Sequence, residues 1–317
     1  MDLDSMQKIV EQARALRKPI WQVVLEYDVE NRMTTPEASI ERMRATWRAM
    51  VDAADAYSGE RRSLSGLVGG DGARMRDYYL HHTSIGGEFT AEVIAQALAM
   101  GENNACMNRI VAAPNAGACG VMPAVLIPLW RKEGIPEEKM VEALYVASAI
   151  GAVIAAKASI SGAAGGCQAE IGSASAMAAG ALAYLHGAMP EQICHAVAMA
   201  LKNLMGLVCD PVAGLVEVPC VKRNVIGAMN AIAAADMALA GIQSRIPVDE
   251  VIEAMGDVGR RLPEEFRETA MGGLAVTPTG QAVKDRMSGN KRKHRVLTIK
   301  DSRWKMTRTG ENGGQTS

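Results

Sequence analysis

Two long apolar segments constrain the fold of this chain more than any other feature of its sequence. They span Ala143–Ala156 and Ala174–Leu185, and both contain serine or glycine among small apolar residues. Both fall short of the ~20 residues that a membrane-spanning helix requires. A helix that is apolar on every side is usually surrounded by other helices in a globular core. The two segments therefore predict two buried central helices and no membrane span.

The composition agrees with a fold made of helices. Aromatic residues make up only 4% of the 317 residues, whereas alanine, glycine and the 20 methionines are abundant. Alanine and methionine favour helices, and runs of the β-branched residues that favour strands are few. Gly172, Ala176 and Gly180 recur every four residues and allow another helix to approach closely. We therefore expect an all-α fold, a single compact helical domain with glycine-rich loops over residues 1–280, followed by a basic tail.

The spacing of apolar residues and the capping signals mark the individual helices. Thr35 followed by Pro36 is typical of a helix N-terminus, because threonine caps the first turn and proline is tolerated at its first position. The expected helices are Leu3–Arg17, a second one from about Pro19, Pro36–Tyr57, Ala73–His82, Glu88–Met100, Met107–Ala112, Ala124–Lys132, Glu137–Ala158, Cys167–His186, Pro190–Leu204, Val221–Ile242 and Val248–Phe266.

Residues 281–317 differ from the rest of the chain in charge. They contain ten lysines and arginines against three acidic residues, so this tail is strongly basic while the whole chain carries only −1. The short cluster Lys291–Arg295 is better explained by a solvated, partly disordered tail than by a nucleic-acid site. Since no global charge attracts nucleic acid, we expect no nucleic-acid partner.

Two glycine-rich segments interrupt the expected helices. The first glycine loop (Ser63–Gly72) contains four glycines and two serines, and the second glycine loop (Ala113–Pro123) precedes an apolar helix. Such loops can present backbone N–H groups and hydroxyls to a small anion. They can equally serve as flexible connections, and the residues alone leave both interpretations open.

Three of the six cysteines lie beside residues that break helices. Two glycines precede Cys167, a proline follows Cys209 at the second position, and a proline directly precedes Cys220. The segment Asp210–Pro219 is predicted to be an irregular loop. Three thiols at loop ends suggest a metal site with one open coordination position, which is typical of catalytic sites. The alternative is that these cysteines serve as small buried hydrophobes, and no C-x-x-C pair indicates a zinc site.

The remaining cysteines suggest no second metal site. Cys194 and His195 are adjacent in an expected helix, so their side chains point to different faces and cannot share a metal. Cys119 lies inside the second glycine loop and is a rival ligand. Six cysteines without a signal peptide indicate a cytoplasmic protein in a reducing compartment, where thiols bind metal or stay free.

Four segments of the chain resemble the iron–sulfur L-serine dehydratases, specifically their α chain or α domain. They are Ser63–Asp71, Ala113–Ala124, Lys157–Gly172 and Asn203–Asn224, and the resemblance extends from roughly residue 5 to residue 280. Two positions depart from the family pattern. Asn115 stands where the family more often has threonine, and Cys119 stands where a small residue is common, so Cys119 is left out of the ligand set.

The resemblance implies a [4Fe–4S] cluster on Cys167, Cys209 and Cys220, with the fourth iron free for L-serine. It also implies that both glycine loops face the substrate. The substrate-binding residues expected in these loops are Ser63, Ser65, Gly66, Gly69, Gly70, Asn115, Ala116 and Gly117.

Removal of water from serine requires an acceptor for the Cα proton and a Lewis acid for the departing hydroxide. Glu170, one turn after Cys167, and Asp210, next to Cys209, are the nearest candidate bases. Either carboxylate can instead orient the loops around the cysteines. Lys157 or Arg223 would neutralise the substrate carboxylate, unless each pairs with an acidic neighbour.

Three other functions stay open on the sequence. A pyridoxal-phosphate dehydratase would use Lys157 as the Schiff base and Ser161–Gly166 as the phosphate site, although the chain lacks the alternating strands of such a fold. A non-catalytic protein would use the metal for stability alone. A cysteine-desulfurating lyase of the same fold would release thiolate in place of hydroxide.

A separate β subunit is the expected partner. Single-chain members of the resembled family carry a β domain before the α part, and the first expected helix here begins at about Leu3. The active site of this family is expected to face the β domain, so a β subunit would complete the site and could supply the general base. The alternative is a self-sufficient homo-oligomer.

Overall fold

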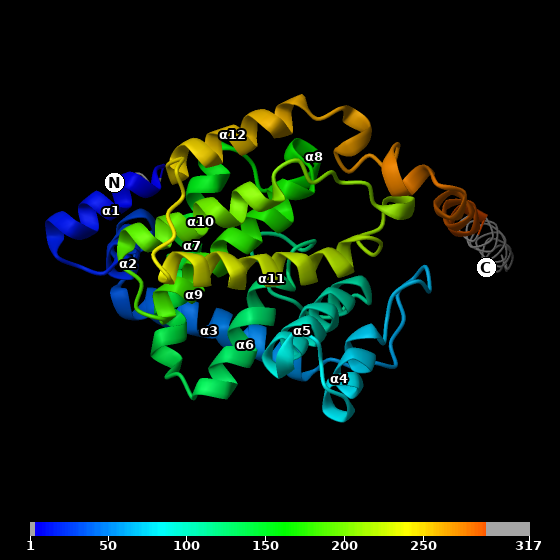
Figure 1. Cartoon of the computed structure of the whole chain (residues 1–317), viewed down its shortest axis with the longest axis horizontal. Helices are drawn as coiled ribbons and strands as arrows, with labels where there is room; N and C mark the ends of the chain where they lie inside the picture. Colours follow the sequence, from blue (N-terminus) through cyan, green and yellow to red (C-terminus); the bar gives the residue numbers. More distant parts are fainter. Residues whose placement is uncertain (1–3, 290–317) are drawn as a thin grey trace, which may run out of the picture.

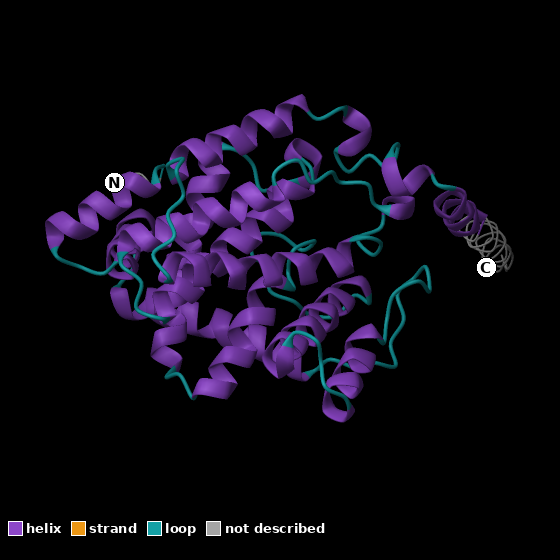
Figure 2. Ribbon diagram, in the orientation of Figure 1, coloured by secondary structure: helices purple, strands orange, loops and turns teal. Residues whose placement is uncertain are grey.

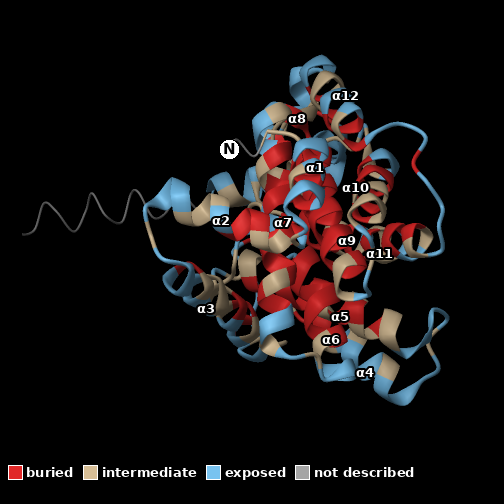
Figure 3. Ribbon diagram, turned by 90° about the vertical axis from the view of Figure 1, so that its left-hand side faces the viewer, coloured by how far each residue is buried: buried red, intermediate tan, exposed pale blue. Residues whose placement is uncertain are grey.

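The two apolar segments lie in α7 (Glu137–Lys157) and α9 (Ser173–Leu185), at the centre of the structure. This computed structural model describes residues 4–289. In α9 every residue from Ser173 to Ala183 is buried, and the buried part of the molecule in Figure 3 follows these helices. By length and composition α7 would suffice to cross a membrane, but 67% of its most apolar window is buried inside the protein. It is the central helix of this core, as predicted.

The all-α prediction is confirmed. Residues 4–289 form no strand (Figure 2), and their one isolated β-bridge joins Cys209 and Arg267. The α-helices besides α7 and α9 are α1 (Met6–Leu16), α2 (Ile20–Arg32), α3 (Pro36–Asp55), α4 (Asp71–His81), α5 (Gly87–Ala105), α6 (Val121–Glu133), α8 (Gly162–Gly165), α10 (Pro190–Leu204), α11 (Cys220–Leu239) and α12 (Val248–Arg261). Shorter helical turns are the π-helical η1 (Gln168–Gly172) and the 3-10 turns η2 (Val212–Gly214), η3 (Glu264–Phe266) and η4 (Gly273–Val276).

Small residues let the central helices approach closely. α9 packs against α6, α7, α10 and α11. A Cβ atom added to Gly180 would lie 2.2 Å from Ile150 Cδ1 and 3.3 Å from Val197 Cγ2. The four-residue spacing of small residues therefore marks a real helix contact at Gly180. The predicted cap of α3 is also present, since Thr35 Oγ1 accepts a hydrogen bond of 3.2 Å from the Ala38 N–H.

One predicted helix is wrong. Residues 107–112 are not helical, because α5 continues to Ala105 and Met107 then adopts a left-handed conformation with φ of 61°. Asn108 fixes this exit by donating to the backbone and side chain of Asn103. The chain then runs irregularly to a cis peptide bond at Pro114.

Several helix boundaries also differ from the prediction. α6 begins at Val121 and so includes Pro123, which is tolerated in the first turn of a helix. The helix expected over Cys167–His186 begins with the π-helical turn η1. The last predicted helix stops at Arg261, because Pro263 cannot continue its hydrogen bonding, and the turn η3 follows.

The chain beyond residue 280 begins as a helix. Residues 278–289 are helical and hold the buried Val283, and Arg286 donates a 2.8 Å hydrogen bond to the carbonyl of Ser65. The first residues of the basic tail thus pack on the domain. The cluster Lys291–Arg295 lies outside the described residues.

Several of the segments that connect these helices lie at one end of the molecule. In Figure 1 the first glycine loop, the segment before α11 and the segment after α12 all lie at the right-hand end. The Arg286–Ser65 hydrogen bond joins two of these segments. The three cysteines with unusual sequence contexts lie among these loops.

Candidate functional site

Cys167, Cys209 and Cys220 come together from three separate segments, and all are buried, with exposed fractions of 2%, 3% and 8%. Cys167 directly precedes η1 and follows Gly166, whose φ is 74°. A Cβ atom on Gly166 would lie 2.6 Å from a side-chain carbon of Leu262, so glycine is required for this turn. Cys220 is the first residue of α11, and a helix N-terminus stabilises a thiolate.

Cys209 is held in an extended segment by the chain that follows α12. Its N–H donates to the Phe266 carbonyl and its own carbonyl accepts from the Glu268 N–H, both at 2.9 Å. Two backbone hydrogen bonds around one residue fix its position firmly. The segment after α12 is therefore part of the wall of the site.

The three thiols are near enough to influence one another electrostatically. Burial, followed by interaction with Cys167, raises the pKa of Cys220 to about 12. Burial raises the pKa of Cys209 as well, and Glu170, Cys167 and Cys220 add to the shift. Within residues 4–289 no three His, Cys, Asp or Glu side chains converge on a single point as ligands of one ion do. Thiolates on a four-iron cluster bind different iron atoms, so they need not converge in this way.

Arg223 connects the cysteine segments from α11. Its guanidinium donates to the Val208 carbonyl at 2.7 Å and to Asp210 Oδ1 at 2.8 Å. It also interacts with Cys167, and this interaction opposes the effect of burial, which raises the pKa of that thiol to about 11. The second oxygen of Asp210 accepts from the Leu274 N–H at 2.8 Å. Both carboxylate oxygens of Asp210 therefore accept hydrogen bonds, as expected for a side chain that orients the loops around the cysteines.

Glu170 differs from Asp210 in its surroundings. Its Oε2 lies 3.9 Å from the Cys209 Sγ. Burial, followed by the nearby Glu268 carboxylate, raises the pKa of Glu170 to about 7. A Cβ atom on Gly162 would lie 2.9 Å from Glu170 Oε2 and 3.1 Å from Glu268 Oε2, so both carboxylates face this glycine. The site therefore contains a pair of carboxylates beside the thiols.

The second glycine loop lies against Glu170 and the start of α11. A Cβ atom on Gly117 would lie 3.2 Å from Glu170 Oε1. The Asn224 amide donates to the carbonyls of Gly117 and Cys220, at 2.9 and 3.0 Å. Asn115 donates to the Ile160 carbonyl at 2.6 Å and accepts from the Ala118 N–H at 3.0 Å. The loop that carries Asn115, Ala116 and Gly117 is thus attached to two of the three cysteine segments.

The first glycine loop reaches the site through Glu217. This buried carboxylate precedes Cys220 by three residues and accepts hydrogen bonds from both Ser63, at 2.6 Å, and Ser65. Gly66, at the tip of the loop, has φ of 77° and no atom near its Cβ direction. Gly69 and Gly70 instead pack against Arg61 and Gly59, where a Cβ atom would meet carbonyl oxygens at 2.2 and 2.9 Å.

Lys157 lies apart from the other predicted site residues. Its Nζ forms an ion pair of 2.6 Å with Glu253 on α12, and no described contact joins it to the three cysteines. The Schiff-base alternative would require this amine to leave its ion pair with Glu253. Cys194 is half-buried in α10, and Cys119 donates to the Met100 carbonyl in the helical core.

Three carboxylates in or near the site were not predicted from the sequence. Glu268 comes from a segment that was expected to follow a helix end, and nothing in its sequence context distinguishes it. Glu217 had a weak signal, since it is the one charged residue between Asp210 and Cys220. Glu102, which anchors the first glycine loop, lies within a helix beside an apolar stretch, where its burial could not be foreseen.

Comparison with known proteins identifies a matching family and several relatives. Residues 15–275 match the profile of the family described as "Serine dehydratase alpha chain". The chain is 40% identical to the L-serine dehydratase alpha chain of Peptoniphilus asaccharolyticus over 287 residues, which cover 89% of this chain and 97% of the relative. It is 52% identical to the probable L-serine dehydratase alpha chain of Bacillus subtilis (strain 168), over 72% of this chain and 76% of the relative.

A longer relative matches over a smaller share of its length. L-serine dehydratase 2 of Escherichia coli (strain K12) is 48% identical over 184 residues, which are 57% of this chain but 40% of that enzyme. Most of the E. coli enzyme therefore has no counterpart in the matched stretch.

Proposed function

This chain belongs to the serine dehydratase alpha chain family, and we propose that it dehydrates and deaminates L-serine to pyruvate and ammonia with a [4Fe–4S] cluster. The observation that carries the proposal is the meeting of three buried cysteines from distant loops beside Glu170. The relatives' names supply the substrate, L-serine. The thiols supply the site at which such chemistry would occur.

The donor set fits a cluster with one iron free of protein ligands. Three thiols are buried together without a fourth cysteine, and Arg223 lies beside Cys167 to balance the negative charge of thiolates. Cys167, Cys209 and Cys220 would hold the cluster. When bound, it supplies a Lewis acid that assists the departure of the β-hydroxyl group of serine.

The side chains around the thiols have separable roles in this proposal. Glu170 is the better placed of the two candidate bases, because Asp210 is already bonded to Arg223 and to the Leu274 N–H. Glu170 would accept the Cα proton of serine at Oε2. Asp210 and Arg223 would hold the Cys209 segment in place. Ser63 and Ser65 donate their hydroxyl protons to Glu217, and the first glycine loop that these bonds hold beside Cys220 would face the substrate carboxylate.

The chain is further proposed to act in the cytoplasm as one subunit of a two-chain enzyme. Two relatives are named as alpha chains, while the matched stretch is only 40% of the longer E. coli enzyme. A β subunit that covers the loop end of the domain would exclude water from the site. If Glu170 is not the base, that subunit is the natural source of one.

The test is anaerobic purification followed by iron analysis, an absorption spectrum and a substrate assay. A broad brown absorption that air bleaches, together with pyruvate release from L-serine, supports the proposal. A yellow band that borohydride reduces would instead indicate a pyridoxal-phosphate enzyme. Sulfide release from L-cysteine in large excess over pyruvate release from L-serine would favour the desulfurating lyase.

A further inference from the structure

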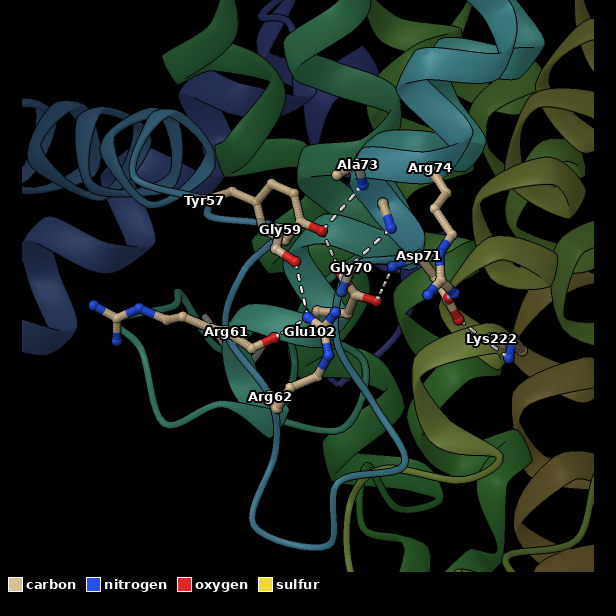
Figure 4. A network of polar contacts seen from close by, with 11 residues as sticks. Tyr57, Gly59, Arg61, Arg62, Gly70, Asp71, Ala73, Arg74, Glu102 and Lys222 are labelled. Carbon is tan, nitrogen blue, oxygen red and sulfur yellow. Dashed lines mark hydrogen bonds and ion pairs between the residues drawn. The ribbon is translucent and has the colours of Figure 1, made fainter.

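A buried glutamate outside the thiol site organises the first glycine loop. Glu102, near the end of α5, is 2% exposed. Burying a carboxylate without hydrogen-bond partners would destabilise the folded protein by several kcal/mol. The groups that bond to Glu102 therefore indicate its role. The groups that bond to this carboxylate lie at the end of the first glycine loop and in the chain that enters it, as Figure 4 shows.

Three backbone N–H groups at the start of α4 converge on this carboxylate. The Asp71 N–H donates to Oε1 at 2.7 Å, and the N–H groups of Gly70 and Gly72 donate to Oε2 at 3.1 and 3.3 Å. Gly70 has φ of 83°, which turns its N–H toward the helix N-terminus. This is the geometry of an anion-binding site at a helix N-terminus, and here the protein's own carboxylate occupies it.

The same carboxylate also binds the chain that enters the loop. The Tyr57 hydroxyl donates to Glu102 Oε2 and accepts a hydrogen bond of 3.1 Å from the Ala73 N–H. Burial and the Glu102 charge raise the pKa of Tyr57, so this hydroxyl stays protonated and remains a donor. Glu102 therefore joins residue 57, before the loop, to residues 70–72 at its end.

We infer that Glu102 is a positioning residue for the first glycine loop, whose Ser63 and Ser65 hydroxyls bond to Glu217 beside Cys220. This inference rests on the proposed function, in which that loop faces the substrate carboxylate. The loop between the two anchored ends is short and closed by hydrogen bonds between Ser63 and Val68. Fixing both of its ends therefore fixes where the two hydroxyls lie beside Glu217 and the start of α11.

Glu102→Gln tests the inference, because glutamine keeps the shape of the side chain but removes its charge and turns an amide N–H₂ toward the backbone donors. The KM for L-serine is expected to rise roughly tenfold, with kcat and iron content changed less than twofold. Tyr57→Phe frees only one end of the loop and should raise KM less. Glu102→Asp, which keeps the charge, should recover part of the loss.

A second readout follows the loop without requiring turnover. Arg61 and Arg62 lie next to the loop, and Arg62 is held by hydrogen bonds to the carbonyls of Gly59 and Arg61. Trypsin should cut after these arginines at least several-fold faster in Glu102→Gln than in the wild type. Glu92→Gln, on the same helix and outside the network of Figure 4, is the matched control and should change neither readout.

The outcomes separate this inference from the proposed function. A wild-type enzyme that does not consume L-serine contradicts the proposed function itself. An active wild type with an unchanged KM in Glu102→Gln overturns the inference alone, whether or not trypsin cuts faster. A wild-type rate of trypsin cleavage in Glu102→Gln also overturns it, because Glu102 would then not hold the loop.

Discussion

At the residue scale, the site is defined by which polar groups are already engaged. Asp210 has partners on both carboxylate oxygens, whereas Glu170 faces Glu268, Gly162 and the Cys209 thiol. The location of each cysteine in the fold separates the three proposed ligands from Cys194. Three lie among loops at one end of the molecule, and Cys194 lies in a regular helix.

The cysteines give the first prediction. Cys167→Ser, Cys209→Ser and Cys220→Ser should each abolish cluster binding, because serine is a poor ligand for iron that prefers thiolate. Cys194→Ser should retain full iron content and activity. Iron and sulfide analysis of anaerobically reconstituted proteins measures this, and normal iron content in any of the first three variants would refute the ligand assignment.

The two candidate bases give the second prediction. Glu170→Gln should lower kcat by about 100-fold or more with iron content retained, as expected for loss of a general base. Asp210→Asn should instead lower stability by about 2 kcal/mol, because it weakens charge-assisted hydrogen bonds with Arg223 and the Leu274 N–H. Steady-state kinetics and thermal unfolding distinguish the two. Unchanged kcat in Glu170→Gln would assign the base elsewhere, most simply to the β subunit.

At the scale of elements, the sequence predicts which segments form regular helices but not where those helices end. Thr35 and Pro36 mark the start of α3 because a cap acts through neighbouring residues. The exit of α5 at Ala105 depends instead on hydrogen bonds between Asn103 and Asn108, and on a left-handed residue at Met107. These two asparagines are themselves held from distant parts of the chain, because Asn103 donates to the Ala53 carbonyl and Asn108 accepts from Arg61. Such tertiary contacts are not visible in the local sequence, and the helix predicted over residues 107–112 is wrong.

The candidate site likewise combines features that the sequence predicts with features that it does not predict. Glycine or proline beside Cys167, Cys209 and Cys220 distinguishes them from Cys106 and Cys194. Cys119 also lies in a glycine loop, and only the family resemblance excluded it as a ligand. The pairing of Glu170 with Glu268 joins residues nearly 100 positions apart. No local pattern carries that information, and only the folding of the segment after α12 onto Cys209 creates it.

Packing of α9 against α7 gives the third prediction. Gly180→Ala should destabilise the protein by about 1–3 kcal/mol, because the added methyl group would lie 2.2 Å from Ile150 Cδ1. Gly289→Ala is the matched control, since its Cβ direction is open and alanine favours helices. Denaturant unfolding measures both changes. Equal stability of Gly180→Ala and the wild type would show that this contact is not close.

At the scale of the whole molecule, the segments around the site lie at one end of the domain. Leu64, Leu67, Met271 and Leu274 are exposed large apolar residues on the loops at this end. Exposed apolar groups around a catalytic site favour a covering partner. This arrangement agrees with the proposed β subunit.

A fourth prediction concerns that subunit. The isolated chain should bind iron but turn over L-serine at least tenfold more slowly than the chain co-expressed with a β chain. The physical reason is that a partner excludes water and completes the site. Pyruvate release measures both preparations under anaerobic conditions. Full turnover by the isolated chain would rule out an obligatory partner.

The central claim is that a cluster on Cys167, Cys209 and Cys220 is required for the dehydration of L-serine. The most direct measurement is the rate of pyruvate formation from L-serine, followed against iron content as iron and sulfide are added stepwise to the anaerobic protein with its β chain. We predict that the rate rises with bound iron and levels off near four iron atoms per chain, the content of one [4Fe–4S] cluster. Turnover by iron-free protein, or no turnover at full iron content, would contradict this account.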